Sequence, residues 1–96
     1  MDISVIIPAY RASKTIARAV DSVLRQTLQA SEIIIVADDE ADYASALKDE
    51  GIASSSLKFL STGATSTGAG NTRNIGIAAA SGECIALLDA DDAFHP

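Results

Sequence analysis

Short apolar runs alternate with more polar stretches along the chain, and the spacing of apolar residues switches between the periods of strands and of helices. The runs rich in β-branched and aliphatic residues predict strands over residues 3–7, 32–36, 57–60 and 83–89. Apolar residues at helical spacing, with capping and stop signals, predict helices over about 13–26, 42–49 and 71–80. Strands that alternate with helices imply parallel pairing through right-handed crossovers, so we expect an α/β fold.

Single residues mark several of these boundaries. Pro8 should end the first strand, because proline has no N–H to donate to a ladder. Ser13 is expected to cap the first helix, and Asp42 the second. The second and fourth strands should be buried on both faces, because their apolar residues run without interruption. Gly76 weakens the prediction of the third helix, since glycine is a poor helix former.

Turn or acidic segments follow directly after three of the predicted strands: Pro8-Ala9-Tyr10, Asp38-Asp39 and the carboxylates at 89, 91 and 92. Ligands bind beyond the carboxyl ends of parallel strands, so these segments should meet at one ligand-binding edge. Asp89 and Asp91 would repel each other there unless protons or a cation neutralised them. Mg²⁺ or Mn²⁺, shared with substrate phosphates, is the usual neutraliser. The alternative is a solvated acidic turn that caps a following helix.

Composition narrows the functions that these segments can serve. The chain has 96 residues, which make one small domain, and its net charge is −6. It has no basic stripe or aromatic platform, which argues against nucleic-acid binding. It has no tract long enough to span a membrane and no signal sequence, so a cytoplasmic location is expected. Cys84 should be a small buried residue of the fourth strand.

Five motifs in register resemble those of the family 2 glycosyltransferases, which have the GT-A fold. They are Val5–Tyr10 at the first strand, Ser22–Thr27 at the end of the first helix, Glu32–Asp39 over the second strand, Gly68–Ile77 around Arg73-Asn74, and Gly82–Asp92 with its Asp-x-Asp segment. The resemblance covers nearly the whole chain in the right order. It implies a partial GT-A, Rossmann-like fold with three layers, a mostly parallel sheet in the order 3-2-1-4, and helices on both faces.

The resemblance also implies a nucleotide-sugar site within residues 1–96. Pro8, Ala9 and Tyr10 would line the pocket for the base and the ribose, and Asp38 would accept a hydrogen bond from the base. Because the imide N–H of uracil suits a carboxylate acceptor, a UDP-sugar is the expected donor.

On the phosphate side, the resemblance implies that Arg73 reaches the nucleotide from the third helix. Asp89 and Ala90 would contact the ribose. Asp91, together with Asp89, would bind the Mn²⁺ or Mg²⁺ ion that carries the diphosphate.

Each assignment has a structural alternative. Asp38 could be a turn residue, Arg73 could merely neutralise the acidic segment, and Tyr10 could be a core aromatic. Among the other acidic residues we expect helix caps or solvated side chains: Asp39, Glu40, Asp42 and Asp92.

The sequence departs from the family pattern around the expected base pocket. Ala37 stands where the first of two aspartates is usual, and Asp39-Glu40 stand where Gly-Ser is usual. Arg11 stands where asparagine is frequent. These differences leave Asp38 in register and alter the surroundings of the base.

Family members continue well past the Asp-x-Asp segment, so the resemblance implies that this chain is the donor-binding half of a transferase. The catalytic base and the acceptor site would lie beyond Pro96, and the chain alone would be inactive. The alternative is a non-catalytic nucleotide-binding or assembly half-domain. The strand at 83–89 would lie at a sheet edge without proline, bulge or inward charge, so we expect self-association, with a homodimer as the ordered form.

Overall fold

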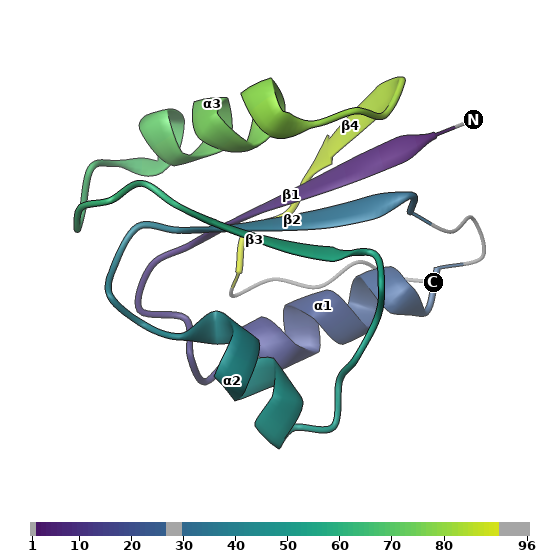
Figure 1. Ribbon diagram of the computed structural model, residues 1–96, viewed down its shortest axis with the longest axis horizontal. Helices are drawn as coiled ribbons and strands as arrows, with labels where there is room; N and C mark the ends of the chain where they lie inside the picture. Colours follow the sequence, from purple (N-terminus) through teal and green to yellow (C-terminus); the bar gives the residue numbers. More distant parts are fainter. Residues whose placement is uncertain (1, 27–29, 91–96) are drawn as a thin grey trace.

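The computed structural model describes residues 2–26 and 30–90, which form a parallel sheet with helices on both faces (Figure 1). In chain order the elements are β1 (Ile3–Ala9), α1 (Ile16–Leu24), β2 (Glu32–Ala37), α2 (Tyr43–Asp49), β3 (Leu57–Ser61), α3 (Ala69–Ala79) and β4 (Cys84–Leu87). The strand order is β3-β2-β1-β4, and each neighbouring pair is parallel. The predicted α/β class and strand order are confirmed.

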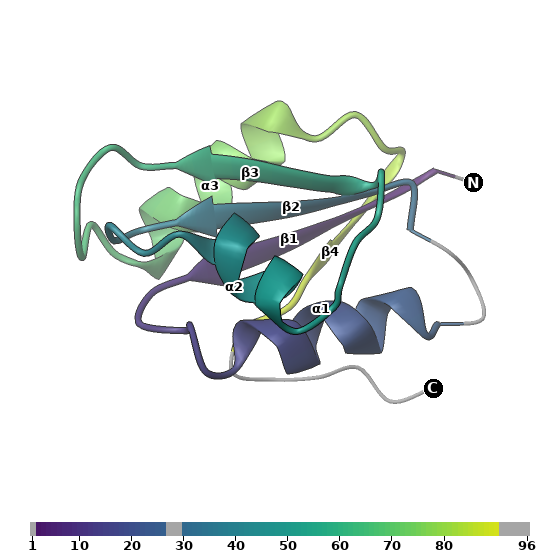
Figure 2. The same cartoon turned by 60° about the horizontal axis from the view of Figure 1, so that its bottom comes forward.

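Two hydrophobic cores lie on the two faces of the sheet. α1 and α2 cover one face and α3 covers the other (Figures 1 and 2). The larger core, on the side of α1 and α2, includes Val5, Ile7, Ile33 and Ile35. The smaller core, beneath α3, is formed by Ile6, Ile34 and Val36. Alternate residues of β1 and β2 thus point into different cores, which explains why both strands are apolar beyond Ser4 and Glu32 at their amino ends.

β1 continues through Pro8 to Ala9, so the prediction that proline ends this strand is wrong. The carbonyl of Ile6 accepts from the N–H of Leu88 at 3.0 Å, on the side of β4, and the carbonyl of Ala9 accepts from the N–H of Asp38 at 2.8 Å, on the side of β2. Because peptide groups along a strand alternate in direction, Pro8 faces the side of β4, beyond the end of that strand. Its missing N–H therefore costs the ladder between β1 and β2 no hydrogen bond.

The helices begin and end close to the predicted positions. α1 begins at Ile16 with Thr15 as its N-cap residue, so the prediction that Ser13 caps this helix is wrong. The carbonyl of Ala12 accepts from the N–H groups of Thr15 and Ile16 at 3.0 and 2.8 Å, and Ser13 lies inside the turn that these bonds close. The predicted cap of α2 is confirmed, since the carboxylate of Asp42 accepts from the N–H of Ser45 at 3.0 Å. None of the helices in the described part of the chain has the length and apolar character needed to span a bilayer.

Gly76 lies at the point where α3 approaches the sheet most closely. The residue is buried, and a Cβ atom there would collide with Cγ2 of Ile6 and lie 3.2 Å from Cγ2 of Val36. The absence of a side chain allows α3 to pack directly on β1 and β2. This packing explains why the helix tolerates a residue that costs about 1 kcal/mol relative to alanine.

β4 lies at the sheet edge, as predicted, but it is not buried on both faces. Ile85 and Leu87 are 43% and 47% exposed, and Cys84 is exposed as well. Ala86, which alternates with them, packs against the larger core, whereas α3 packs on β1 and β2. The predictions of a doubly buried fourth strand and of a buried Cys84 are therefore wrong, because the described elements cover β4 mainly on one face.

Candidate functional site

A cavity of about 210 Å³ opens at the carboxyl ends of β1 and β2. Its lining residues are Pro8, Ala9, Tyr10, Asp38, Ser66, Gly68, Ala69, Thr72 and Asp89. Five of these, from three separate motifs, are predicted site residues. Arg73 lies next to them through a contact with Asp89, and Ala90 is buried directly after Asp89. The structure therefore brings most of the predicted residues to one place.

Asp38 is 3% exposed, and its carboxylate accepts three hydrogen bonds from the segment between β3 and α3. Oδ1 accepts from the hydroxyl of Thr62 at 2.9 Å and from that of Thr67 at 2.7 Å, while Oδ2 accepts from the N–H of Gly68 at 3.0 Å. Burial raises the pKa of Asp38, but the hydrogen bonds to its ionised form prevail and lower the pKa to about 2. Asp38 is therefore charged at neutral pH and anchors this segment to the end of β2.

Gly68 connects the anchored segment to α3. It has a φ of +106°, a conformation that side-chain-bearing residues rarely adopt. Its carbonyl accepts from the hydroxyl of Thr72 at 2.8 Å, and the N–H of Ser66 donates to the carbonyl of Asp38 at 2.9 Å. Asp38 thus holds, through its backbone and its side chain, the segment that forms one wall of the cavity.

Tyr10 lines the cavity and is 40% exposed, so the alternative of a core aromatic is wrong. The guanidinium carbon of Arg11 lies 5.2 Å from the centroid of the Tyr10 ring, within cation–π range. Arg11 has a φ of +52°, and its N–H donates to Oδ2 of Asp39 at 2.7 Å. The turn after β1 is therefore fixed by the residue next to Asp38.

Asp39 is a structural acceptor that the sequence analysis missed, since we expected it to be solvated. Its carboxylate accepts from the hydroxyl of Tyr43 at 2.8 Å and from the N–H of Ala41 at 3.2 Å. The Tyr43 oxygen in turn accepts from the N–H of Ala12 at 3.2 Å. Burial, with the neighbouring carboxylate, raises the pKa of Tyr43 to about 12. Asp39 thereby joins the turn after β1 to the start of α2.

Arg73 forms an ion pair with Asp89, with 3.1 Å between Nη2 and Oδ1. The side chains are 36% and 59% exposed, so the pair contributes at most about 1 kcal/mol to stability. This contact fits the structural alternative, in which Arg73 neutralises an acidic residue. Nε of Arg73 is also buried, with no hydrogen-bond partner among the described residues. Arg73 therefore keeps an unused donor beside the cavity, and its contact with a nucleotide stays a prediction.

The predicted metal ligands are only partly described. Asp91 and the expected cap Asp92 lie outside the described residues. Within residues 2–26 and 30–90, no group of three or more His, Cys, Asp or Glu side chains is placed to hold a metal ion. Asp89 fits a role as a single ligand, because it is an exposed carboxylate on the cavity wall and supplies the hard oxygen donor that Mg²⁺ and Mn²⁺ prefer.

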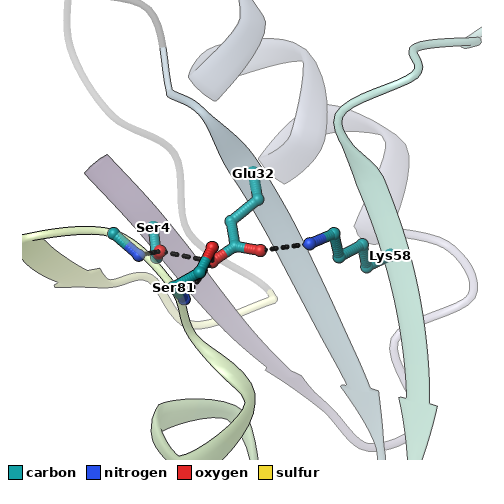
Figure 3. Close-up of polar contacts among 5 residues, drawn as sticks. Ser4, Glu32, Lys58 and Ser81 are labelled. Atoms are coloured by element: carbon teal, nitrogen blue, oxygen red, sulfur yellow. Dashed lines mark hydrogen bonds and ion pairs between the residues drawn. The ribbon is translucent and has the colours of Figure 1, made fainter. Parts of the chain in front are cut away.

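A second polar cluster, also not predicted, surrounds Glu32 at the amino ends of the strands (Figure 3). Glu32 is 2% exposed and accepts from Nζ of Lys58 at 2.5 Å, from the hydroxyl of Ser4 at 2.5 Å and from the N–H of Ser81 at 2.6 Å. These bonds, with Lys58 foremost, lower the pKa of Glu32 to about 2. The Ser4 oxygen also accepts from the N–H of Gly82 at 2.8 Å. The cluster ties β1, β2 and β3 to the turn before β4, far from the cavity.

A larger cavity of about 470 Å³ lies beside β3 and the start of α2. Ile35 and Phe59 contribute to its apolar lining, and its carboxylates include Asp39 and Asp42. Both carboxylates are engaged in hydrogen bonds within the protein. Because none of the predicted site residues lines this cavity, we place the candidate site in the smaller one.

Comparison with known proteins identifies relatives of the chain. Residues 4–96 match the sequence profile of Glycosyl transferase family 2. An uncharacterized glycosyltransferase of Nostoc sp. (strain PCC 7120) is 38% identical over 96 residues, which are 100% of this chain and 30% of that protein. The UDP-Glc:alpha-D-GlcNAc-diphosphoundecaprenol beta-1,3-glucosyltransferase WfgD of Escherichia coli is 38% identical over 90 residues, which are 94% of this chain and 35% of that enzyme. The chain thus spans about a third of the length of these curated relatives.

Solved structures agree with this result. The structure of S. aureus TarS 1–349 has a TM-score of 0.81 at 28% identity, covering 97% of this chain and 28% of that one, and the structures of the same protein with UDP and with UDP-GlcNAc have the same score. The mannosyltransferase PcManGT from Pyrobaculum calidifontis, in complex with GDP-Man and Mn²⁺, has a TM-score of 0.78 at 23% identity. The match covers 96% of this chain and 28% of that one, and it supports the fold alone. The fold is a partial GT-A fold, and the chain belongs to glycosyl transferase family 2.

Proposed function

We propose that the chain binds the nucleoside diphosphate of a nucleotide-sugar donor in the 210 Å³ cavity, and that this donor is a UDP-sugar. The observation that carries the proposal is that Tyr10, Asp38 and Asp89, from three separate strand ends, line one cavity. Ligands of parallel α/β sheets bind at this edge. Two relatives support the choice of donor: the Escherichia coli enzyme is named for UDP-Glc, and TarS has been crystallised with UDP and UDP-GlcNAc.

The base would be recognised by Asp38, which has room for one more hydrogen bond. An ionised carboxylate offers about four lone-pair sites. Thr62, Thr67 and Gly68 use three of them, two on Oδ1 and one on Oδ2. The fourth, on Oδ2, suits the ring N–H of uracil. Cytosine lacks a hydrogen on the corresponding nitrogen, so the cavity should prefer UDP to CDP.

The remaining cavity residues would hold the ribose and the apolar faces of the base. Pro8 and Ala9 supply an apolar wall, and the partly exposed ring of Tyr10 offers a surface on which a base can stack. Asp89 and the backbone of Ala90 would contact the ribose hydroxyls. Each of these residues lies at the end of β1 or just after β4, so the sheet fixes the spacing between the groups.

Asp91, together with Asp89, would hold a divalent ion, Mn²⁺ or Mg²⁺. When bound, such an ion offsets the charge that develops on a diphosphate leaving group. Arg73 would orient Asp89 through their ion pair and donate its unused N–H toward the nucleotide.

In a transferase, this chain would supply the donor-binding half. The titratable side chains that line the cavity in the described residues are Tyr10, Asp38 and Asp89, and each already has a binding role. The proposal therefore assigns no catalytic base among residues 2–26 and 30–90, and we expect no sugar transfer by the chain alone. Transfer to a defined acceptor by the purified chain would contradict this expectation. Binding without turnover, even in a longer protein that contains this chain, would favour the alternative of a non-catalytic nucleotide-binding half-domain.

Calorimetry with UDP and CDP tests the proposal. We expect UDP to bind in the presence of Mn²⁺, to bind more weakly with chelator, and to outcompete CDP. Asp38→Asn should lower the preference for UDP, whereas Glu40→Gln, a change at an exposed neighbour, should leave it intact. Equal affinity for UDP and CDP would contradict base recognition by Asp38. Absence of binding by any nucleoside diphosphate would contradict the proposed function itself.

A further inference from the structure

We propose that Thr67 is a positioning residue for base recognition: its hydroxyl, oriented by Asn71, fixes the Asp38 carboxylate as an acceptor for bases that carry a ring N–H. Nucleotides of uracil, thymine and guanine present such a group, and those of cytosine and adenine do not. The inference rests on the proposed function, since it concerns which base the cavity takes. It goes further by assigning the discrimination to a residue of the segment between β3 and α3.

The direction of the hydrogen bonds singles out Thr67. The side-chain N–H of Asn71 donates to the Thr67 oxygen at 2.9 Å, so the hydroxyl hydrogen of Thr67 is directed to Oδ1 of Asp38 at 2.7 Å. Thr62 also donates to Oδ1, but its oxygen lies 3.1 Å from the carbonyl of Ala64, which competes for the same hydrogen. The hydroxyl hydrogen of Thr62 thus has two competing acceptors, the Ala64 carbonyl and Asp38, whereas that of Thr67 is directed to Asp38 alone.

A donor that bonds only to Asp38 matters because the carboxylate must present its open lone pair to the base in one direction. The hydroxyl of Thr67 holds Oδ1 at 2.7 Å, and the N–H of Gly68 occupies one lone pair of Oδ2 at 3.0 Å. Together these bonds fix the rotation of the carboxylate and so the direction of the remaining lone pair of Oδ2, which suits a ring N–H. The ring nitrogen of cytosine or adenine carries no hydrogen and would meet this oxygen lone pair to lone pair.

Few charged groups near Asp38 could replace the hydrogen bond from Thr67. The segment from Thr62 to Gly68 contains no charged residue. The titratable or charged residues on the elements around Asp38 are Tyr10, Arg11, Asp39, Arg73 and Asp89. Arg11 and Arg73 are the cations among them: the guanidinium of Arg11 lies over the Tyr10 ring, and that of Arg73 pairs with Asp89. The charge of Asp38 is therefore stabilised mainly by neutral donors, of which Thr67 gives the shortest bond.

The test compares Thr67→Val, which has nearly the same shape but no hydroxyl, with Thr67→Ser, which keeps the hydroxyl. We expect Thr67→Val to lower the ratio of UDP to CDP affinity, measured by calorimetry with Mn²⁺, by about three- to tenfold. Thr67→Ser should restore the ratio. In parallel, the titration of the Asp38 carboxyl carbon, followed by ¹³C NMR, should move to higher pH in Thr67→Val and return in Thr67→Ser. Asn71→Ala, a change at an exposed position, should shift the affinity ratio and the Asp38 titration in the same direction by a smaller amount. This variant replaces Thr67→Val in the test if Thr67→Val fails to fold.

The two readouts separate the possible failures. An unchanged affinity ratio in folded Thr67→Val, or a ratio that Thr67→Ser does not restore, would overturn the inference while UDP binding itself stands. If the wild-type chain binds neither nucleotide, the proposed function fails, and the NMR titration alone decides whether Thr67 fixes Asp38. A titration of Asp38 that is the same in wild type and Thr67→Val would then overturn that role too.

Discussion

Arg73 in α3 and Asp89 just after β4 are 16 residues apart in the sequence, yet their side chains meet beside the cavity with 3.1 Å between Nη2 and Oδ1. Asp89 lines the cavity, and Arg73 approaches it from the helix. Since both side chains are partly exposed, the main effect of the pair is to orient the carboxylate and only secondarily to stabilise the fold.

Replacing Arg73 by glutamine should therefore affect binding more than stability. We expect the free energy of unfolding to change by less than about 1 kcal/mol, as for other exposed ion pairs. The affinity for UDP with Mn²⁺ should fall about tenfold, because a charge-assisted hydrogen bond near the diphosphate is lost. Urea unfolding and calorimetry measure the two quantities. Arg25→Gln, which breaks the exposed pair with Asp21 on α1, is the matched control and should change neither. A large loss of stability in Arg73→Gln alone would assign the residue to the fold.

The metal-dependent binding of UDP should require Asp91 and not Asp92. Asp91→Asn should weaken UDP binding in the presence of Mn²⁺ by about 1–3 kcal/mol, because one charged ligand of the ion is lost. Asp92→Asn removes the same charge one position later, where we expect a helix cap, and should leave the affinity unchanged. Calorimetry with Mn²⁺ and with chelator distinguishes the two variants. Equal losses in both would indicate a general effect of charge and not a ligand position.

The Glu32 cluster should make stability depend on pH in the acid range. The pKa of Glu32 falls from 4.5 to about 2 on folding, so its stabilising contribution is complete above about pH 4.5 and is lost as pH falls toward 2. Glu32→Gln should lower the free energy of unfolding at pH 7 by about 1–3 kcal/mol. The difference from wild type, measured by urea unfolding, should shrink between pH 5 and pH 3. Asp21→Asn, at an exposed ion pair, should cost less than about 0.5 kcal/mol at pH 7. A difference that stays constant down to pH 3 would contradict the lowered pKa.

Two glycines of α3 should respond in opposite ways to the same substitution. Gly76→Ala places a methyl group against Ile6 and Val36, and such overpacking costs about 1–3 kcal/mol. Gly70→Ala meets no atom within 4 Å, so the better helix propensity of alanine should stabilise the protein by about 0.5–1 kcal/mol. Thermal or urea unfolding of the two variants gives the comparison. If Gly76→Ala were also stabilising, α3 would not lie as close to the sheet as described.

The exposed edge of β4 should cause self-association, and we expect the ordered product to be a homodimer. The N–H groups of Cys84 and Leu88 donate to the carbonyls of Asp2 and Ile6, so by alternation the peptide groups of Ile85 and Leu87 face outward. In the described residues no strand pairs with this side. Leu87→Lys adds a charge at the edge and should reduce association, as edge lysines do in natural sheets. Analytical ultracentrifugation at micromolar concentration measures the association. Ala78→Lys, which adds the same charge on the exposed surface of α3, is the control. A wild-type monomer would contradict the prediction.

The sheet and the convergence of the candidate site residues could be predicted from the sequence because both follow from local patterns. Apolar runs such as residues 32–36 identify strands, and alternation with helices makes the strands parallel. Parallel strands place their carboxyl ends at one edge, so the sequence alone predicts that Tyr10, Asp38 and Asp89 meet there. The structure confirms that they line one cavity.

The partners of the buried carboxylates could not be predicted in this way. Thr62 and Thr67 are 24 and 29 residues from Asp38, and Ser81 is 49 residues from Glu32. No periodicity connects such residues, and serine and threonine are common in any loop. The prediction that β4 is buried on both faces was wrong for a related reason. An apolar run identifies a strand, but which helices cover that strand depends on the whole topology.

Pro8 limits how far β4 can pair with β1. The ladder between these strands could be extended beyond Ile6 only if the next N–H of β1 on that side donated to β4. In the observed register that position is Pro8, opposite the carbonyl of Leu88, and its nitrogen carries no hydrogen. The pairing therefore ends at Ile6 and Leu87. One proline thereby sets the length of an edge pairing and leaves the chain at Asp89 free to turn toward the cavity.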